Sequence, residues 1–173
     1  MKRHRFGLAA TLCAALMLLT GQALGETYDG FSVDAKSAVL IERESGAVLF
    51  AQNENEALPM ASTTKVMTAL LAIERGNPDD VVTVGRNAFG VPGTSIYLSE
   101  GEHISLHDLL YGLMLASGND AAVAIAEHIG GSVDEFCAMA TERARQLGCE
   151  RTTFVNPNGL PVAGHHTTAL ELA

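Results

Sequence analysis

The stretch LPMASTTKVMTALLA, residues 58–72, is apolar except for its threonines and a Ser-Thr-Thr-Lys interruption at residues 62–65. The spacing of its apolar residues predicts a helix that begins at residue 62. The helix should end at residue 75, because Gly76 and Pro78 supply the usual helix-end signals. Ser62 and Lys65 are three residues apart, so they share one face of that helix. Lys65 is the only charged residue in the stretch.

The pairing of Ser62 with Lys65 has a chemical interpretation. A serine becomes a nucleophile when a base removes its proton, and a lysine is a base only when it is neutral. Apolar neighbours and the positive end of a helix dipole both lower a lysine pKa. The alternative is that Ser62 or Thr63 caps the helix while Lys65 extends to water, and one SxxK pair alone is a weak signal.

A second motif accompanies the first. Ser117-Gly118-Asn119 falls 55 residues after Ser62, at a predicted turn between two helices. There a hydroxyl and a carboxamide can face a cleft while the flanking helices stay buried. The combination of SxxK with SDN and KTG is typical of penicillin-binding proteins and class A β-lactamases. Here the second motif is SGN.

The remaining pattern predicts strands followed by helices. Apolar runs at residues 38–41 and 47–51 around Glu44-Ser45-Gly46 predict a β-hairpin. Helices are expected from Ser105, which is paired with Asp108 as a cap, and from Ser132, which is paired with Glu135. Met114 and Leu147 belong to the apolar faces of these two helices. The other expected elements are strands at 81–84 and 95–98, a helix at 120–129 with protein on every side, an extended segment at 152–156 and a helix capped by Thr167 or Thr168.

The first 25 residues have the pattern of a secretory signal peptide: a basic start, an apolar stretch and a small-x-small cleavage site at residues 23–25. A retained transmembrane anchor is the weaker interpretation, because the apolar stretch is too short. Residues 26–173 are expected to form one domain. They carry eight basic and 20 acidic side chains, a net charge of −12. That charge argues against nucleic acid as a partner.

At this point the chain resembles a family, the D-alanyl-D-alanine carboxypeptidases, which are low-molecular-mass penicillin-binding serine peptidases. The segments SAVLIERESGAVLFAQNEN, LPMASTTKVMTALLA, GTSIYLSEGE, LLYGLMLASGNDAAVAIAEHIGGS and FVNPNGL are similar to that family in the same order. The resemblance implies an α+β fold of the penicillin-binding/β-lactamase-like transpeptidase type. This chain would supply the N-terminal hairpin and the helical lobe, as a partial catalytic domain over residues 26–173.

The resemblance also implies roles. Ser62 is similar to the nucleophile and Lys65 to its general base. Ser117 resembles the hydroxyl that relays a proton to the leaving D-alanine, and Asn119 the substrate-binding amide that also holds Lys65. The backbone N–H of Ser62 is one expected oxyanion donor. The implied partners are the peptidoglycan pentapeptide and β-lactam antibiotics, and the implied location is extracytoplasmic or periplasmic, associated with the cell envelope.

The chain departs from the family in one motif. It contains no KTG or KSG, because its only lysines are Lys2, Lys36 and Lys65. We therefore expect a C-terminally truncated product of low activity, without the remaining strands of the antiparallel sheet and without the family's membrane-associating tail. The alternatives are a β-lactamase-like hydrolase, for which Glu150 is a poorly placed deacylation base, and a non-catalytic fragment.

The sequence predicts neither a metal nor another cofactor. His103 and His107 are separated by the Ser105 cap, and His165-His166 has no third ligand at a metal spacing. His128, near a helix end, is expected to interact with the helix dipole. Cys137 and Cys149 are expected to be free thiols. A helix between them would separate them by about 18 Å, whereas a disulfide needs Cα atoms within about 7 Å.

Overall fold

The computed structural model describes residues 32–173, so the predicted signal peptide at residues 1–25 lies outside the described part. The elements in chain order are β1 (Ala38–Ile41), β2 (Val48–Gln52), the 3₁₀ turn η1 (Ala61–Thr63), α2 (Thr64–Arg75), β3 (Val81–Thr83), β4 (His103–Ser105), α3 (Leu106–Leu115), α4 (Asn119–Gly130), α5 (Val133–Gln146) and α6 (Ala169–Leu172). The described strands form two separate two-stranded antiparallel sheets, β1-β2 and β3-β4. The predicted α+β class is confirmed.

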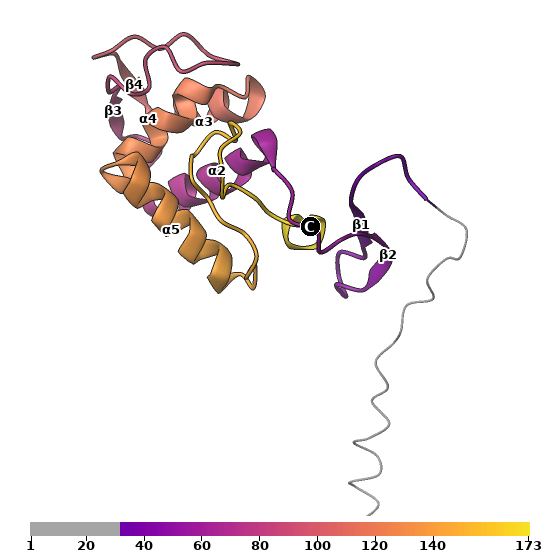
Figure 1. Ribbon diagram of the computed structural model, residues 1–173. Helices are drawn as coiled ribbons and strands as arrows, with labels where there is room; N and C mark the ends of the chain where they lie inside the picture. Colours follow the sequence, from indigo (N-terminus) through magenta and orange to yellow (C-terminus); the bar gives the residue numbers. More distant parts are fainter. Residues whose placement is uncertain (1–31) are drawn as a thin grey trace, which may run out of the picture.

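The predicted hairpin forms, with its second strand starting one residue later than expected. Strands β1 and β2 pair from Ala38 opposite Gln52 to Ile41 opposite Val48, with an irregularity before Ile41. The Glu42 carboxylate closes the turn by accepting hydrogen bonds from the backbone N–H groups of the next residues in the loop. In Figure 1 the hairpin stands apart from the helices, and the C-terminal end of the chain lies between them.

The C-terminal segment connects the hairpin to the helical body. Leu58 and Thr167 exchange backbone hydrogen bonds of 2.8 and 3.1 Å, and the N–H of Leu170 donates to the Glu54 carbonyl at 3.0 Å. Thr168 caps α6 by accepting from the N–H of Glu171 at 3.1 Å, which confirms one of the two predicted caps. Two segments more than a hundred residues apart thus lie side by side next to the hairpin.

Helix α4 is the centre of the helical body. Each of its residues from Asn119 to Ala126 is buried, because α2, α3, α5 and β3 all pack against it. One hydrophobic cluster lies between α4 and the leucines of α3, and a second lies between α4 and α5 around Phe136. The prediction of a helix surrounded by protein is confirmed.

The predicted caps of the two flanking helices are present. Ser105 accepts from the N–H of Asp108 at 3.0 Å, and Ser132 accepts from the N–H of Glu135 at 3.2 Å. The predicted apolar faces are too wide at their C-terminal ends, however. Met114 is 51% exposed and Leu147 is 52% exposed. Each lies at the last turn or just beyond it, where the described residues bring no further layer over the helix.

The prediction of a strand at residues 95–98 is wrong. The partner of β3 is His103–Ser105, and residues 95–98 are irregular. Their polar groups are taken by the buried Asp120 carboxylate, which accepts from the Ser95 hydroxyl at 2.6 Å and from the N–H groups of Ile96 and Leu98 at 3.0–3.2 Å. A carboxylate that accepts these donors replaces the neighbouring strand that the alternating pattern had predicted.

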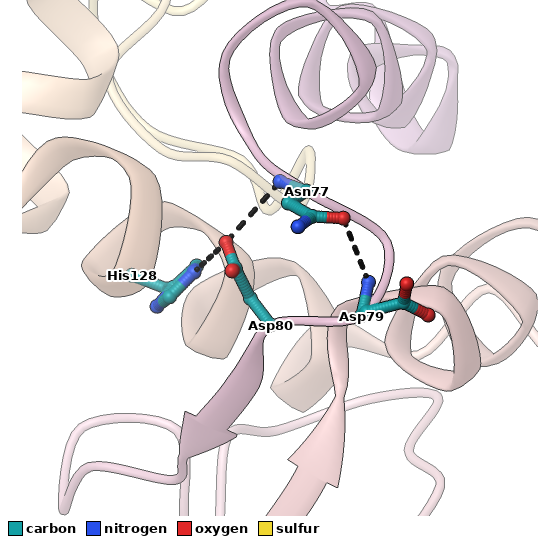
Figure 2. A network of polar contacts seen from close by, with 4 residues as sticks. All are labelled: Asn77, Asp79, Asp80 and His128. Carbon is teal, nitrogen blue, oxygen red and sulfur yellow. Dashed lines mark hydrogen bonds and ion pairs between the residues drawn. The ribbon is translucent and has the colours of Figure 1, made fainter.

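Figure 2 shows how the loop after α2 turns into β3. Asp80 accepts from the N–H of Asn77 at 3.2 Å, and the Asn77 side chain accepts from the N–H of Asp79 at 3.2 Å. The ring of His128, in the last turn of α4, lies 3.2 Å from the same Asp80 carboxylate. His128 therefore has a direct acidic partner in addition to its position at the helix C-terminus.

Candidate active site

Ser62 lies in the 3₁₀ turn that precedes α2, so the predicted α-helix starts two residues later than expected. The chain enters this turn through Ala61, whose φ of 46° is in the left-handed region that few non-glycine residues adopt. Gly159 packs against the same point, since a Cβ there would lie 1.8 Å from the Ala61 carbonyl oxygen. This backbone strain is next to the candidate nucleophile, as is common at functional sites.

Lys65 is 3% exposed, although it is a lysine in the first turn of a helix. Its Nζ lies 3.2 Å from Ser62 Oγ, 2.8 Å from Asn119 Oδ1 and 2.7 Å from the Asn158 carbonyl oxygen. None of these partners is charged. Burial lowers the pKa of Lys65, in the direction that the apolar neighbours predict.

The partners of Lys65 suit a neutral amine. The Asn119 side-chain oxygen and the Asn158 carbonyl can only accept, so they take two N–H donors of Nζ. A neutral amine then has its lone pair left for the third direction, where the Ser62 hydroxyl lies. An ammonium would fill the same three positions with three donors. The amine can therefore gain or lose a proton while these atoms keep their positions, and only the Ser62 hydroxyl changes between acceptance and donation of a hydrogen bond.

The SGN turn brings the second motif onto the first. Ser117 has a φ of 55° in the turn between α3 and α4, and its Oγ lies 3.1 Å from Ser62 Oγ. Asn119 is the first residue of α4 and is 6% exposed. Its Nδ2 donates to the Pro92 carbonyl at 2.7 Å, which directs Oδ1 toward Lys65. All four residues named from the sequence thus meet at one place.

The Asn-Pro-Asn-Gly turn at residues 156–159, here called the NPNG turn, completes the cage around the amine. The sequence gives no reason to place this turn at the site, because its contribution is the backbone carbonyl of Asn158. The Thr68 hydroxyl of α2 donates to the Pro157 carbonyl at 2.7 Å and fixes the turn against the helix. The turn is the main part of the site that sequence reasoning missed.

A pocket of about 340 Å³ opens beside the nucleophile. It is lined by three of the four candidate site residues, by Thr63 and by three apolar side chains: Ser62, Thr63, Lys65, Val66, Leu113, Met114 and Ser117. The exposed Met114 is thus a wall of this pocket. Glu150, the weak candidate for a deacylation base, is exposed and is not among the lining residues.

The histidines singled out in the sequence lie elsewhere or have other partners. His103 contacts Thr83 at 3.1 Å, and His107 lies against Tyr111 and Asp108. Within residues 32–173 no three His, Cys, Asp or Glu side chains gather as a metal site would require. No helix in that range has the length and apolar content of a membrane span. Cys137 and Cys149 are free, as predicted.

Comparison with known proteins identifies the family that this chain matches. Residues 23–173 match a family model described as D-alanyl-D-alanine carboxypeptidase. The chain is 41% identical to the D-alanyl-D-alanine carboxypeptidase DacF of Bacillus subtilis, over 96% of this chain and 46% of that protein. It is 37% identical to DacD of Salmonella typhimurium, over 100% of this chain and 47% of that protein. The chain therefore spans about half the length of these relatives.

Solved structures have the same arrangement of elements. The D-alanyl-D-alanine carboxypeptidase DacD of Francisella tularensis superposes with a TM-score of 0.79 at 30% identity, over 91% of this chain and 39% of that one. Penicillin-binding protein 6B of Escherichia coli superposes with a TM-score of 0.77 at 38% identity, over 82% of this chain and 48% of that one.

Proposed function

Because this chain belongs to the D-alanyl-D-alanine carboxypeptidase family, we propose that it carries the nucleophile and base of a serine enzyme that acts on D-Ala-D-Ala peptides of peptidoglycan through an acyl-enzyme. One observation supports the proposal above the others. The Lys65 amine is buried among neutral acceptors and lies 3.2 Å from the hydroxyl of Ser62. A buried, uncompensated amine next to a serine is suited to general-base catalysis.

In the proposed acylation step, neutral Lys65 takes the Ser62 hydroxyl proton as Oγ attacks the carbonyl carbon of the penultimate D-alanine. The C–N bond to the terminal D-alanine then breaks and the serine ester forms. The departing amine needs one proton, which the Lys65 ammonium supplies. Ser117 Oγ lies 3.1 Å from Ser62 Oγ and is the group through which this proton passes to the leaving nitrogen.

In the deacylation step a water molecule attacks the ester, and the same amine removes its proton. The Ser62 oxygen recovers a proton and the shortened peptide leaves. Asn119 keeps Lys65 in place throughout and offers its amide to the substrate backbone. Among the described residues, the backbone N–H of Ser62 is the group that we propose as a hydrogen-bond donor to the oxyanion of the intermediate.

The family context supports the finer assignments. We propose that the chain is exported, works outside the cytoplasm at the cell envelope, and is acylated at Ser62 by β-lactam antibiotics. A β-lactam presents a reactive amide carbonyl to the same nucleophile. Its ester with Ser62 is expected to persist, and Glu150 is not among the residues that line the pocket, where a second deacylation base would have to lie.

Residues 26–173 alone should acylate slowly. They contain no KTG or KSG, the motif that the family places on the wall opposite the nucleophile. The family also draws its second oxyanion donor from the strand that carries this motif. Loss of one oxyanion donor typically reduces the rate by about 10²- to 10³-fold. A chimera that continues residue 173 with the C-terminal half of the Bacillus subtilis relative should label with a fluorescent penicillin faster by that order. Equal labelling rates for the two proteins would mean that the third motif is dispensable here.

The function is tested by D-alanine release from a peptide ending in D-Ala-D-Ala, alongside penicillin labelling. The proposal requires D-alanine release and a stable label, both lost in Ser62→Ala and both kept in a matched variant at the exposed Ser99, Ser99→Ala. A label that turns over rapidly would identify a β-lactamase-like hydrolase. No label and no release, in a folded protein, would identify a non-catalytic fragment.

A further inference from the structure

His165 is buried between helix α2 and the loop that carries the NPNG turn, with 4% of its surface exposed. Its Nδ1 accepts a hydrogen bond from the N–H of Val155 at 3.0 Å. The proton of a neutral ring must then be on Nε2, which lies 2.7 Å from the Thr64 hydroxyl and donates to it. Burial and the neighbouring His166 lower the pKa of His165 and favour this neutral form.

The two hydrogen-bond partners of this ring, Thr64 and Val155, each directly precede a part of the site in the sequence. Thr64 immediately precedes Lys65 in the first turn of α2. Val155 immediately precedes the NPNG turn, whose Asn158 carbonyl accepts from the Lys65 amine at 2.7 Å. The ring therefore connects the side chain of the residue before the base to the backbone of the residue before the turn that covers it.

The NPNG turn is closed by its own side-chain hydrogen bonds and is attached to α2. The Asn156 side chain accepts from the N–H of Gly159 at 2.7 Å and donates to the Leu160 carbonyl at 2.7 Å. Outside these internal bonds, Thr68 holds the Pro157 carbonyl. Thr64 and Thr68 lie four residues apart and share a face of the helix. Thr68 and, through His165, Thr64 thus attach this segment to one face of α2, beside the hydrogen bond from Lys65 to the Asn158 carbonyl.

We infer that His165 is a positioning residue, which holds the Asn158 carbonyl against the Lys65 amine. The inference rests on the function proposed above, since it matters to catalysis only if Lys65 is the base. When the ring is removed, the turn keeps its shape but loses one attachment to α2. It then moves away from the amine, and water reaches Lys65. Burial is what lowers the pKa of this lysine, so exposure raises it.

The ring itself does not touch the reacting atoms. Its described contacts are Thr64, Val155, the edge of Phe154 at a centroid distance of 5.9 Å, and the adjacent His166. The effect of His165 must therefore pass through the turn. A residue with only a structural role would change the stability of the protein but not the titration of Lys65, which separates the two interpretations.

The experiment measures the amine directly in the full chain. Competitive acetylation with acetic anhydride over a pH series, read by peptide mass spectrometry, gives the pKa of Lys65 with the exposed Lys36 as internal reference. The variants are His165→Ala and His165→Gln, whose amide offers one acceptor and one donor in place of the ring nitrogens. Thr168→Ala is the matched control, because it removes the α6 cap in the same segment, where its side chain is hydrogen-bonded to the N–H of Glu171.

We expect His165→Ala to raise the pKa of Lys65 and, on the rising limb of the parent's pH profile, to lower penicillin acylation about tenfold for each unit of that rise. Its rate should recover at higher pH. His165→Gln should stay close to the parent, and Thr168→Ala should leave both readouts unchanged. Parental titration and acylation in His165→Ala, or an equal shift in Thr168→Ala, would overturn the inference.

Failure of the proposed function has a different signature. A parent chain that neither acylates nor releases D-alanine would reject Lys65 as a base in catalysis. The acetylation series needs no activity and would still decide whether His165 holds the turn over the amine. A change in the Lys65 titration without any acylation in the parent would thus support the positioning role and reject the enzyme.

Discussion

Replacement of Asn119 by Asp tests whether Lys65 acts as a neutral base. Asn119 Oδ1 lies 2.8 Å from the Lys65 amine and is buried. The substitution changes little in volume but places a carboxylate in contact with an amine that has only neutral partners. An opposite charge at this distance typically raises a lysine pKa by about one to three units. At a fixed pH at which the parent amine is mostly protonated, the neutral fraction of Lys65 falls by about 10- to 1000-fold.

The sign of the pH effect is definite. A raised pKa keeps Lys65 protonated to higher pH, so the rising limb of the acylation profile moves toward alkaline pH by the same number of units. Acylation of Asn119→Asp by a fluorescent penicillin should be slow at pH 7 and should rise with pH beyond the range in which the parent has reached its plateau. The carboxylate of the variant also lacks the N–H that donates to the Pro92 carbonyl in the parent. The acylation rate on the alkaline plateau should therefore be lower than in the parent.

The matched control is Asn87→Asp, which changes the same side chain at an exposed position beside Glu127. It should acylate as the parent does at every pH. If Asn119→Asp kept the parental profile, or lost activity by the same factor at all pH values, then proton loss from Lys65 would not control the reaction. The reasoning about a neutral amine would then be wrong.

Three further outcomes follow from the same structure. Lys65→Met should abolish acylation at every pH while circular dichroism shows an intact fold, and a parental rate would remove its role as base. Asp120→Ala should lower the free energy of unfolding in urea by about 3 kcal/mol, because several buried donors lose their acceptor, whereas the exposed Asp108→Ala should cost less than half of that. Burial, and then the charge of Asp134, raise the pKa of Cys137 to about 11, so this thiol should resist a thiol reagent at pH 8 in the native protein. Denaturation without reductant should make both Cys137 and Cys149 reactive, and a disulfide between them would contradict the structure.

Asp120 also makes the stability depend on pH in a defined direction. Burial opposes ionisation of this carboxyl, but the hydrogen bonds from Ser95 and from three backbone N–H groups outweigh it and lower its pKa. A carboxyl with a lowered folded-state pKa stabilises the fold above its unfolded-state pKa, near 4. That contribution is lost as the pH falls through the folded-state value. The parent should therefore lose more stability in acid than Asp120→Ala does.

The sequence predicts the helices well and the loops around them poorly. Helices α3, α4 and α5 follow from capping residues such as Ser105 and Ser132 and from apolar periodicity, which are local features. The failed strand at residues 95–98 depends on Asp120, which lies far along the chain and accepts the amides that a neighbouring strand would take. An alternating pattern cannot reveal whether the acceptor of those amides is a strand or a buried side chain.

The site divides in the same way. Ser62, Lys65, Ser117 and Asn119 could be named because side-chain chemistry and spacing identify them. The Asn158 carbonyl could not, since any residue carries a backbone carbonyl and only the packing of the NPNG turn brings this one to Lys65. His165 was considered as a metal ligand and rejected, and its actual contacts with Thr64 and Val155 are long-range or backbone contacts without a spacing signal.

The most direct test of the central claim is to locate the acyl group. The full chain is incubated with a β-lactam, quenched in acid and digested, and the adduct is located by tandem mass spectrometry. The account predicts one adduct with the mass of the intact β-lactam on the Ser62 hydroxyl, absent in Ser62→Ala and slow to form in Lys65→Met. An adduct on Ser117 or on another residue, or continued acylation of Ser62→Ala, would contradict it.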